Sequence, residues 1–457
     1  MTAVTDYAVT DPVTGEVITI YDMFTDEQIA DSVDKAEAGF RVWRETSVAD
    51  RAVVIRRCAE LQRGRRHEFA EIITKEMGKP LEQSLGEVDL AADITEFYAD
   101  NAATITADQS IEDAAGGTAL VRRAPLGVLF GIMPWNFPSY QVARFAAPNL
   151  ILGNTIILKH APQCPESAAL LEEIYRDAGC PDGAYVNVYA SNDQSAEIIA
   201  DPRVQGVSVT GSERAGAAVA AQAGRHLKKV ALELGGSDPF IVLDVDDLDT
   251  VAEAAVAART DNNGQVCNAP KRFIVTDENY EAFVEKFVDG MRSVTLGDPL
   301  VDGTELGPLS SPAAVDRLQE QIDRAVAQGA TLLAGGQREG NYFPGTVLVD
   351  VTPDMDVYRE ELFGPAGVIY RAANEEDAIR IANDTPFGLG SYVYTDSPEQ
   401  ADRVANAIDA GMVYVNCVLA DSPELPFGGV KRSGTSRELG LLAADEFVNK
   451  KLIRIGD

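Results

Sequence analysis

The sequence predicts an α/β protein built on doubly wound parallel sheets. From residue 127 onward, short apolar segments alternate with amphipathic helical segments, the pattern of parallel strands joined by right-handed crossovers. Several of the apolar segments are continuous rather than alternating, as strands covered on both faces of a sheet are. At 457 residues the chain is too long for one ordinary core, so we expect more than one domain.

Composition and charge narrow the classes of function. Hydrophobic residues make up 46% of the chain and charged residues 24%, as in globular proteins. The net charge of −33 disfavours binding to nucleic acid or to an anionic membrane, and no apolar run approaches the ~18 residues of a membrane span. Five scattered cysteines and an N-terminus without a signal-peptide pattern predict a reducing, cytoplasmic setting. Three histidines, far apart, argue against a metal site.

The first part of the chain is predicted to be mainly helical. Residues 7–22 favour one or two short strands. A capping box at Thr25 opens the first helical pattern. Helices are expected at about 25–45, 48–76 and 81–108. Residues 117–126 alternate as a strand that leaves the body of the subunit, and the apolar residues 127–133 predict a buried strand.

Strands and helices alternate through the remainder. The expected strands of the first set lie at 154–160, 185–190, 204–210 and 229–234, with helices near 165–179, 193–200 and 213–226. The second set comprises strands near 271–276, 330–333, 346–351, 366–371 and 412–416, with helices at 277–293 and 311–328. A further helix begins after Ser397, with proline at its first position.

Cys267 is the candidate nucleophile. It lies among small and amide residues in the segment Asn262 to Ala269, just after an alanine-rich helical pattern. A thiol attacks carbonyl carbon well and also leaves well, which suits covalent catalysis. The alternative is a buried structural cysteine, which is what most lone cysteines are.

Two other segments hold side chains that a thiol nucleophile would need. Asn136 lies between Pro134 and Pro138, which would fix the loop and orient the amide as an oxyanion donor. Glu233 ends an apolar strand, where partial desolvation would raise its pKa toward that of a general base. The alternatives are a rigid turn and a hydrogen-bonded structural carboxylate.

A ligand with a phosphate group is suggested by a third region. Gly211 allows close backbone approach after a strand, and Ser212 caps a helix whose positive end would face an anion. Lys159 ends another strand, at the edge where open α/β sheets bind ligands. No G-x-G-x-x-G follows a strand, so a dinucleotide would be held differently from the usual Rossmann arrangement. An ordinary βα turn and a solvated lysine are the alternatives.

The ordered set of these segments resembles the aldehyde dehydrogenase superfamily over nearly the whole chain. The segments are Pro134-Trp135-Asn136-Phe137-Pro138, Lys159, Gly211-Ser212, Glu233-Leu234-Gly235-Gly236, Gly264-Gln265-Val266-Cys267, Glu361-Leu362-Phe363-Gly364-Pro365 and Pro426-Phe427-Gly428-Gly429. Each segment is weak alone, but their order is specific. Within the superfamily the chain is similar to the bacterial and archaeal succinate-semialdehyde dehydrogenase branch, through Lys159 to Pro162, Leu234 to Phe240 and Gln141 to Arg144.

The resemblance implies a reaction. Cys267 would attack the aldehyde to give a thiohemiacetal, with the oxyanion between the Asn136 amide and the Cys267 N–H. Hydride transfer to the nicotinamide would leave a thioester, which water activated by Glu233 would hydrolyse. The implied activity is NAD(P)-dependent oxidation of succinic semialdehyde to succinate. The alternatives are another short aldehyde, such as glutarate semialdehyde, or a cysteine hydrolase with Glu233 as its base.

The resemblance also implies contacts to NADP or NAD. The implied cofactor-binding residues are Met133, Trp135, Lys159, His160, Ala161, Pro162, Gly211, Ser212, Leu234, Glu361 and Phe363. NAD-preferring members often carry a glutamate three residues after the lysine, where this chain has Pro162. Because nothing acidic there opposes a 2′-phosphate, NADP is favoured.

Arg144 and Ser422 are the substrate-binding residues that the resemblance implies. Arg144 matches an arginine directed at the distal carboxylate of succinic semialdehyde, and a local guanidinium is what an acidic protein would need there. Similar enzymes often read Ser-Asp-Pro-Arg where this chain reads Asp421-Ser422-Pro423-Glu424. At this segment the serine is displaced by one residue, and glutamate stands in place of the arginine.

The implied architecture is aldehyde dehydrogenase-like, with three parts. A Rossmann-like cofactor domain would comprise residues 1–109 and 127–234, and an α/β catalytic domain residues 235–432. A bridging β-ribbon would come from residues 110–126 and 433–457. Such strands pair across subunits, so a homodimer or homotetramer is expected.

Overall fold

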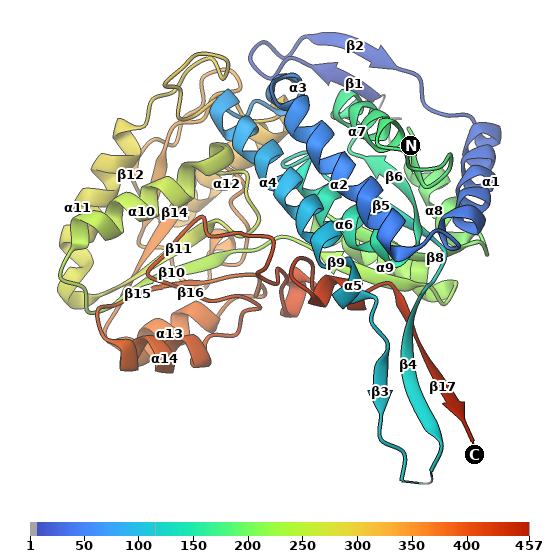
Figure 1. Cartoon of the computed structure of the whole chain (residues 1–457). Coiled ribbons are helices and arrows are strands. Elements are labelled where there is room, and N and C mark those ends of the chain that lie inside the picture. Colours follow the sequence, from blue (N-terminus) through green and yellow to red (C-terminus); the bar gives the residue numbers. More distant parts are fainter. Residues whose placement is uncertain (1–6, 115, 457) are drawn as a thin grey trace.

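The computed structural model describes residues 7–114 and 116–456. The first six residues, on which the expectation of no signal peptide depends, lie outside the described part, as do residue 115 and the last residue of the expected ribbon. Two α/β bodies lie side by side, and a narrow β-ribbon projects from one of them (Figure 1). The boundaries drawn between domains stay a prediction.

The first body is organised around a five-stranded parallel sheet. Its strands are β5 (Val128–Met133), β6 (Thr155–His160), β7 (Tyr185–Asn187), β8 (Val204–Thr210) and β9 (Lys229–Glu233). They lie in the order β7-β6-β5-β8-β9. The chain runs outward from β5 in one direction and then from β8 in the other. The crevice at the carboxyl ends of β5 and β8 is therefore the topological switch point, where open α/β sheets bind ligands.

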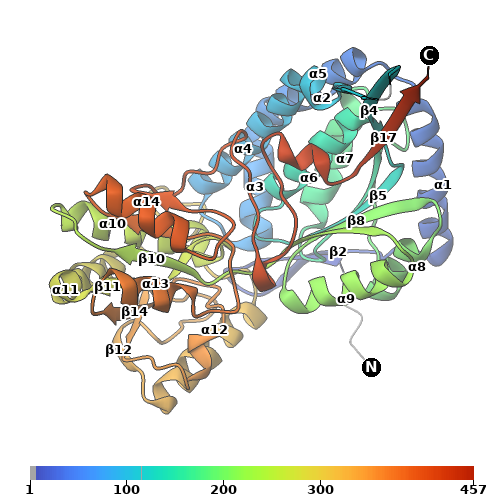
Figure 2. The same ribbon diagram turned by 90° about the horizontal axis from the view of Figure 1, so that it is seen from below.

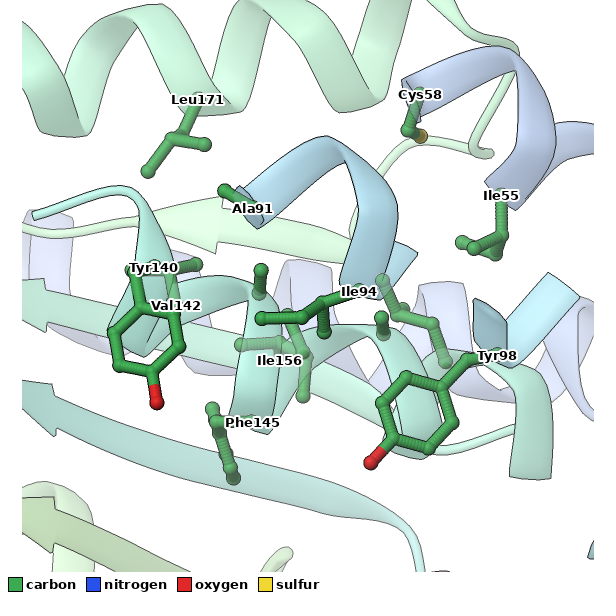
Figure 3. Close-up of a cluster of buried hydrophobic side chains, with 14 of the residues drawn as sticks. Ile55, Cys58, Ala91, Ile94, Tyr98, Tyr140, Val142, Phe145, Ile156 and Leu171 are labelled. Atoms are coloured by element: carbon green, nitrogen blue, oxygen red, sulfur yellow. The ribbon is translucent and has the colours of Figure 1, made fainter. Parts of the chain in front are cut away.

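Helices cover both faces of this sheet. They are α1 (Asp26–Trp43), α2 (Val48–Gly64), α3 (Arg66–Met77), α4 (Leu81–Asp100), α5 (Ala102–Ile105), α6 (Tyr140–Leu152), α7 (Pro165–Asp177), α8 (Asn192–Ala200) and α9 (Glu213–Arg225). The hairpin of β1 (Tyr7–Thr10) and β2 (Val17–Tyr21) lies beside them. The core joins α2, α4, α6 and β6, through Ile55, Ile94, Phe145 and Ile156 (Figure 3).

The second body holds a seven-stranded sheet. Its strands are β10 (Asp238–Val242), β11 (Pro270–Thr276), β12 (Thr331–Ala334), β13 (Thr346–Val349), β14 (Ala366–Ala372), β15 (Tyr392–Tyr394) and β16 (Tyr414–Val415). Their order is β12-β13-β14-β11-β10-β15-β16, and only β12 is antiparallel to its neighbour. Separate apolar clusters cover its two faces, one with α10 (Leu248–Thr260) and α11 (Asp277–Ser293). The other includes α12 (Pro312–Gln328), α13 (Glu375–Asn383) and α14 (Pro398–Ala407).

The ribbon is a three-stranded antiparallel sheet. Its strands are β3 (Gln109–Ile111), β4 (Thr118–Pro125) and β17 (Val448–Ile455), in the order β17-β4-β3. Figure 2, which shows the molecule from below, has β4 and β17 side by side. Residues 433–447 do not join the ribbon, and the first of them, Ser433 to Ser436, contact the end of β9. No helix in the described ranges is long and apolar enough to cross a membrane.

Candidate active site

Cys267 lies on a rigid loop between the two bodies. After α10 the chain turns through η1 (Asp261–Gly264), in which Asn262 and Asn263 take left-handed backbone conformations that asparagine tolerates. Lys271 then anchors the loop, because its buried ammonium donates to the carbonyls of Val266 (2.8 Å), Cys267 (2.7 Å) and Ala269 (3.2 Å). The sulfur is thus carried by backbone that three charged hydrogen bonds hold in place.

Asn136 is fixed against the same loop. Its side chain is 4% exposed, and its Nδ2 donates to the carbonyl of Gln265 at 2.9 Å. Gln141 donates to its Oδ1 (3.2 Å), and the Asn262 amide donates to its backbone carbonyl (2.8 Å). These contacts orient the N–H₂ group of Asn136 toward the nucleophile loop, as an oxyanion donor must be.

Glu233 ends β9 and is buried. One carboxylate oxygen, Oε1, accepts a hydrogen bond from the Ser436 hydroxyl at 2.6 Å, whereas Oε2 has no partner among the described residues. Burial raises the pKa of Glu233 well above its ordinary value, and the nearby Glu438 carboxylate raises it further against the opposing charge of Arg144. A desolvated carboxylate with one free oxygen can accept a proton.

Two cavities meet at Cys267. The first, of about 330 Å³, lies between α4, α6 and the loop that carries Asp421, and Phe137, Tyr140 and Phe427 contribute to its largely apolar wall. The second, of about 180 Å³, lies at the topological switch point. It is bordered by Cys267, Asn136 and Glu233 together. Among the predicted residues, this is where all three catalytic candidates converge.

The second cavity has the features of a nucleotide site. The Ser212 hydroxyl caps α9 by accepting from the Ala215 N–H, so the positive end of that helix faces the cavity. Thr210 has a buried hydroxyl without a partner among the described residues, and nothing lies within 4 Å of where a side chain at Gly211 would begin. The open space and unused donors fit a phosphate-bearing cofactor.

The predicted cofactor residues divide into two groups. Six of them border the second cavity: Trp135, Gly211, Ser212, Leu234, Glu361 and Phe363. Glu361 accepts from the Gly236 N–H at 3.1 Å, and the Trp135 and Phe363 rings pack edge to face. The other five lie at the ends of β5 and β6 without bordering it: Met133, Lys159, His160, Ala161 and Pro162. Burial lowers the pKa of Lys159 to about 8 and that of His160 to about 4.

Neither predicted substrate residue borders the first cavity. Arg144 is fully buried behind its wall, where its Nε lies 2.7 Å from an oxygen of Glu438. Its guanidinium also lies over the rings of Tyr140 (4.6 Å) and Phe427 (4.3 Å). Ser422 does not border the cavity, but its neighbour Asp421 does. The substrate-binding roles of Arg144 and Ser422 stay predictions.

The thiol of Cys267 is protonated in this environment. Burial raises its pKa to about 12, although the charges of Arg144 and Lys271 oppose the shift. Attack therefore requires that a base take the proton, and Glu233 borders the same cavity. Sequence reasoning did not single out Lys271, Ser436 or Glu438, because only tertiary contacts bring them to the site. No group of three or more potential metal ligands occurs in the described ranges.

Comparison with known proteins identifies the class. The aldehyde dehydrogenase family matches residues 2–453, and this chain belongs to that family. Among curated relatives, the succinate-semialdehyde dehydrogenase [NADP(+)] of Deinococcus radiodurans is 48% identical over 451 residues, covering 98% of this chain and 94% of that protein. The succinate semialdehyde dehydrogenase [NAD(P)+] Sad of Escherichia coli (strain K12) is 43% identical over 442 residues, covering 96% and 95%.

Solved structures agree with this class. A structure of Gox0499 superposes with a TM-score of 0.97 at 46% identity, covering 99% of this chain and 100% of that one. The succinic semialdehyde dehydrogenase of Streptococcus pyogenes, solved with NADP⁺ as cofactor, gives a TM-score of 0.96 at 41% identity and covers 99% and 100%. The predicted α/β fold and its family are confirmed.

Proposed function

We propose that this protein is an NADP-dependent dehydrogenase that oxidises succinic semialdehyde to succinate. The observation that carries the proposal is the meeting of two cavities at Cys267, with Asn136 and Glu233 on the wall of the second. One cavity suits a short aldehyde and the other a nucleotide, so that sulfur, aldehyde and hydride acceptor come together. The names of the relatives supply the substrate and the cofactor.

The first step belongs to Cys267. Its sulfur adds to the aldehyde carbon as the carbonyl π bond breaks, and the thiol proton passes to Glu233. The Asn136 amide and the Cys267 backbone N–H donate hydrogen bonds to the oxyanion of the thiohemiacetal. A nicotinamide nucleotide bound in the second cavity supplies the acceptor for the hydride that then leaves the same carbon.

The second step returns the thiol. The carbonyl re-forms as a thioester on Cys267, and Glu233 releases the thiol proton to solvent. Its free oxygen then takes a proton from a water that adds to the thioester carbon. The carbon–sulfur bond breaks, the carboxylic acid leaves, and the sulfur takes a proton back from Glu233 to re-form the thiol. Glu233 needs to be unprotonated for this step, which its burial makes dependent on pH.

The residues at the end of β6 favour NADP over NAD. The position three residues after Lys159 is Pro162, so a ribose 2′-phosphate would meet no carboxylate there, and the Lys159 ammonium is at hand. Lys159 is only 6% exposed, so water screens its positive charge weakly. A 2′-phosphate that reached the ammonium group would therefore be attracted more strongly than at the protein surface.

A substrate panel with both cofactors tests the proposal. The purified protein should reduce NADP⁺ with succinic semialdehyde, as measured by the absorbance of the reduced nicotinamide. Cys267→Ala should abolish that activity while leaving NADP⁺ binding intact. Turnover of pentanal or glutarate semialdehyde without turnover of succinic semialdehyde would refute the substrate, and ester hydrolysis at full rate without any nicotinamide would refute the reaction.

The ribbon supports assembly into a homodimer or homotetramer. Among the strands of the described ranges, β17 pairs with β4 alone, and its Leu452 and Ile455 residues are each 63% exposed. An edge strand with exposed apolar side chains among its charged ones is stabilised by pairing with another chain. The proposed setting is the cytoplasm, because the reaction needs Cys267 as a thiol and a reducing compartment keeps it so.

A further inference from the structure

One face of α4 contacts two loops of the candidate active site. The nucleophile loop comprises residues 261–269 and carries Cys267, and the oxyanion loop comprises residues 134–138 and carries Asn136. Gln83 and Glu87 stand four residues apart on α4, so their side chains lie on the same face of that helix. Both side chains border the first cavity, and each bonds to the backbone at one of the two loops.

Gln83 holds the start of the nucleophile loop. Its Oε1 accepts a hydrogen bond from the backbone N–H of Asn262 at 2.8 Å. The Asn262 side chain donates in turn to the backbone carbonyl of Asn136 at 2.8 Å. Just before α4, the Gly78 carbonyl accepts from the side chain of Asn263 at 2.9 Å. The beginning of α4 and the turn before it therefore fix the two asparagines that shape the nucleophile loop.

Glu87 holds the residues that follow the oxyanion loop. Its Oε1 accepts from the backbone N–H groups of Ser139 (2.8 Å) and Tyr140 (3.1 Å) at the start of α6. A carboxylate from another helix thus occupies the N-terminal end of α6, where free N–H groups and the helix dipole favour negative charge. Gln141, in the first turn of α6, donates to the Oδ1 of Asn136 at 3.2 Å. Fixing the start of α6 therefore fixes the Asn136 amide.

Lys79 keeps the Glu87 carboxylate in place. Its ammonium group donates to the Oε2 of Glu87, so both oxygens of that carboxylate are bonded. The same ammonium lies 3.7 Å from the centre of the Phe137 ring in the oxyanion loop. The side chains of Lys79 and Glu87 are 1% and 0% exposed. A buried carboxylate bonded to fixed donors at both oxygens has few other positions open to it.

We propose that Gln83 and Glu87 are positioning residues that hold Asn136 and Cys267 at the separation that the oxyanion requires. Because one helix supplies both acceptors, the two loops keep a fixed position relative to each other. A misplacement of about 1 Å at an active site can lower a rate about 10²-fold. The proposal rests on the aldehyde oxidation proposed above, and it assigns no bond-making step to either residue.

A double-mutant cycle with Asn136→Ala tests whether the two residues act through the oxyanion donor. Gln83→Met removes the acceptor and should lower kcat/KM by about 10–10²-fold. NADP⁺ binding should change little, since other residues border the second cavity. In that background Asn136→Ala should cost about tenfold or less instead of about 10²–10³-fold, because a displaced donor has less to lose. Glu87→Gln should show the same loss of additivity.

Two matched controls lie on other helices. Gln194 is a buried glutamine whose Oε1 accepts from the backbone N–H of Ser191 at the start of α8. Glu76 is a buried glutamate that accepts from two backbone N–H groups at the start of α7. Gln194→Met and Glu76→Gln remove the same kinds of contact, so each should lower the midpoint of thermal unfolding. Their effects on kcat/KM should simply multiply with that of Asn136→Ala.

Hydrogen–deuterium exchange measures the same contacts without turnover. Peptides that cover residues 261–269 should exchange faster in Gln83→Met than in the wild type, and peptides that cover residues 134–142 should exchange faster in Glu87→Gln. The two controls should leave both regions at the wild-type rate. Glu87→Gln leaves the buried Lys79 without its partner, so Gln83→Met decides the test if Glu87→Gln does not fold.

The outcomes separate this inference from the proposed function. Multiplicative effects of Gln83→Met and Asn136→Ala would overturn the positioning role while leaving the oxidation in place. An unchanged exchange rate of the nucleophile loop in Gln83→Met would also overturn that role. Faster exchange in a protein that oxidises no aldehyde would refute the proposed oxidation and still support the contacts from α4.

Discussion

The Asn136 side chain owes its orientation to two partners, the Gln265 carbonyl and the Gln141 amide. Because the donor is already positioned, little reorganisation is needed when an oxyanion forms beside it. Asn136→Ala should therefore lower kcat/KM by about 10²–10³-fold.

The control for Asn136→Ala is the reactivity of the nucleophile itself. Alkylation of Cys267 by iodoacetamide should proceed at nearly the wild-type rate, because Lys271 still holds three carbonyls of the loop when the side-chain contact from Asn136 to Gln265 is lost. A loss of less than tenfold in kcat/KM would show that the amide does not stabilise the oxyanion.

The pH dependence of turnover should follow Glu233. Its raised pKa means that the carboxyl is protonated and inactive on the acid side, so kcat should rise with pH until the base form predominates. Glu233→Gln should remove that rise and abolish turnover without a burst of reduced nicotinamide, because neither the Cys267 thiol nor the attacking water can then pass its proton to this side chain.

A substitution of Glu438 offers a second test of the role of Glu233. Its carboxylate raises the pKa of Glu233, and Arg144 lowers it. In Glu438→Gln both effects act in one direction, since the repelling charge is lost and Arg144 is left unpaired. The acid limb of the kcat profile should therefore move to lower pH. Glu399→Gln, at an exposed site, should leave it in place, and an unmoved limb in Glu438→Gln would contradict the electrostatic origin of the shift.

At the scale of elements, sequence patterns predicted the first sheet well. The continuous apolar segments at 127–133, 154–160 and 204–210 became β5, β6 and β8, because strands buried on both faces carry that pattern. The expected helix at 48–76 is interrupted at Arg65, where the backbone leaves the helical region between α2 and α3. Gly64, the last residue of α2, directly precedes this break, and it is the local signal that the expected continuous helix did not take into account.

β10 was not expected, although it is central to the second sheet. Pro239 argues against an interior strand, since proline cannot donate to the ladder. In the structure the pairing with β11 shifts register between Asp238 and Pro239, so the missing N–H falls at a bulge. A strand that contains a proline at a bulge can be recognised only when the positions of the neighbouring strands are known.

Some residues of the candidate active site could likewise not be predicted from local sequence patterns. Cys267, Asn136 and Glu233 stand in distinctive segments, and the structure brings them to one cavity. Ser436 and Lys271 have no distinctive neighbours, and they matter only because the chain folds back on Glu233 and on the nucleophile loop. Their contribution is set by tertiary contacts, which spacing along the chain does not reveal.

The anchor of the nucleophile loop gives a prediction at this scale. Lys271→Met removes three charged hydrogen bonds to backbone carbonyls and leaves the partly buried Glu361 without its cation. Breaking a buried ion pair costs about 3–5 kcal/mol, so the midpoint of thermal unfolding should fall by roughly 3–5 °C in a chain of this length. Lys75→Met is the control, because its surface ion pair with Glu71 should be worth about 1 kcal/mol or less. Equal midpoints in the two variants would contradict the anchoring role.

For the whole molecule, the last segment of the chain connects catalysis with assembly. Residues 433–436 hold the end of β9, with the Ser433 carbonyl accepting from the Leu234 N–H and the Ser436 hydroxyl donating to Glu233. β17 then leaves for the ribbon. Because the contacts to Glu233 lie within one chain, separated subunits should keep the geometry of the base.

Leu452→Asp tests whether catalysis is independent of assembly into oligomers. A charge on an exposed apolar position of the edge strand should weaken pairing between chains, so the protein should sediment as a smaller species than the wild type. Leu227→Asp is the control, since that leucine is 94% exposed but lies far along the chain from the ribbon strands. Oxidation of succinic semialdehyde should continue in Leu452→Asp, because Cys267, Asn136 and Glu233 come from the same subunit. Loss of this activity together with the change in size would mean that a neighbouring subunit supports the site, and an unchanged size would show that β17 is not the assembly surface.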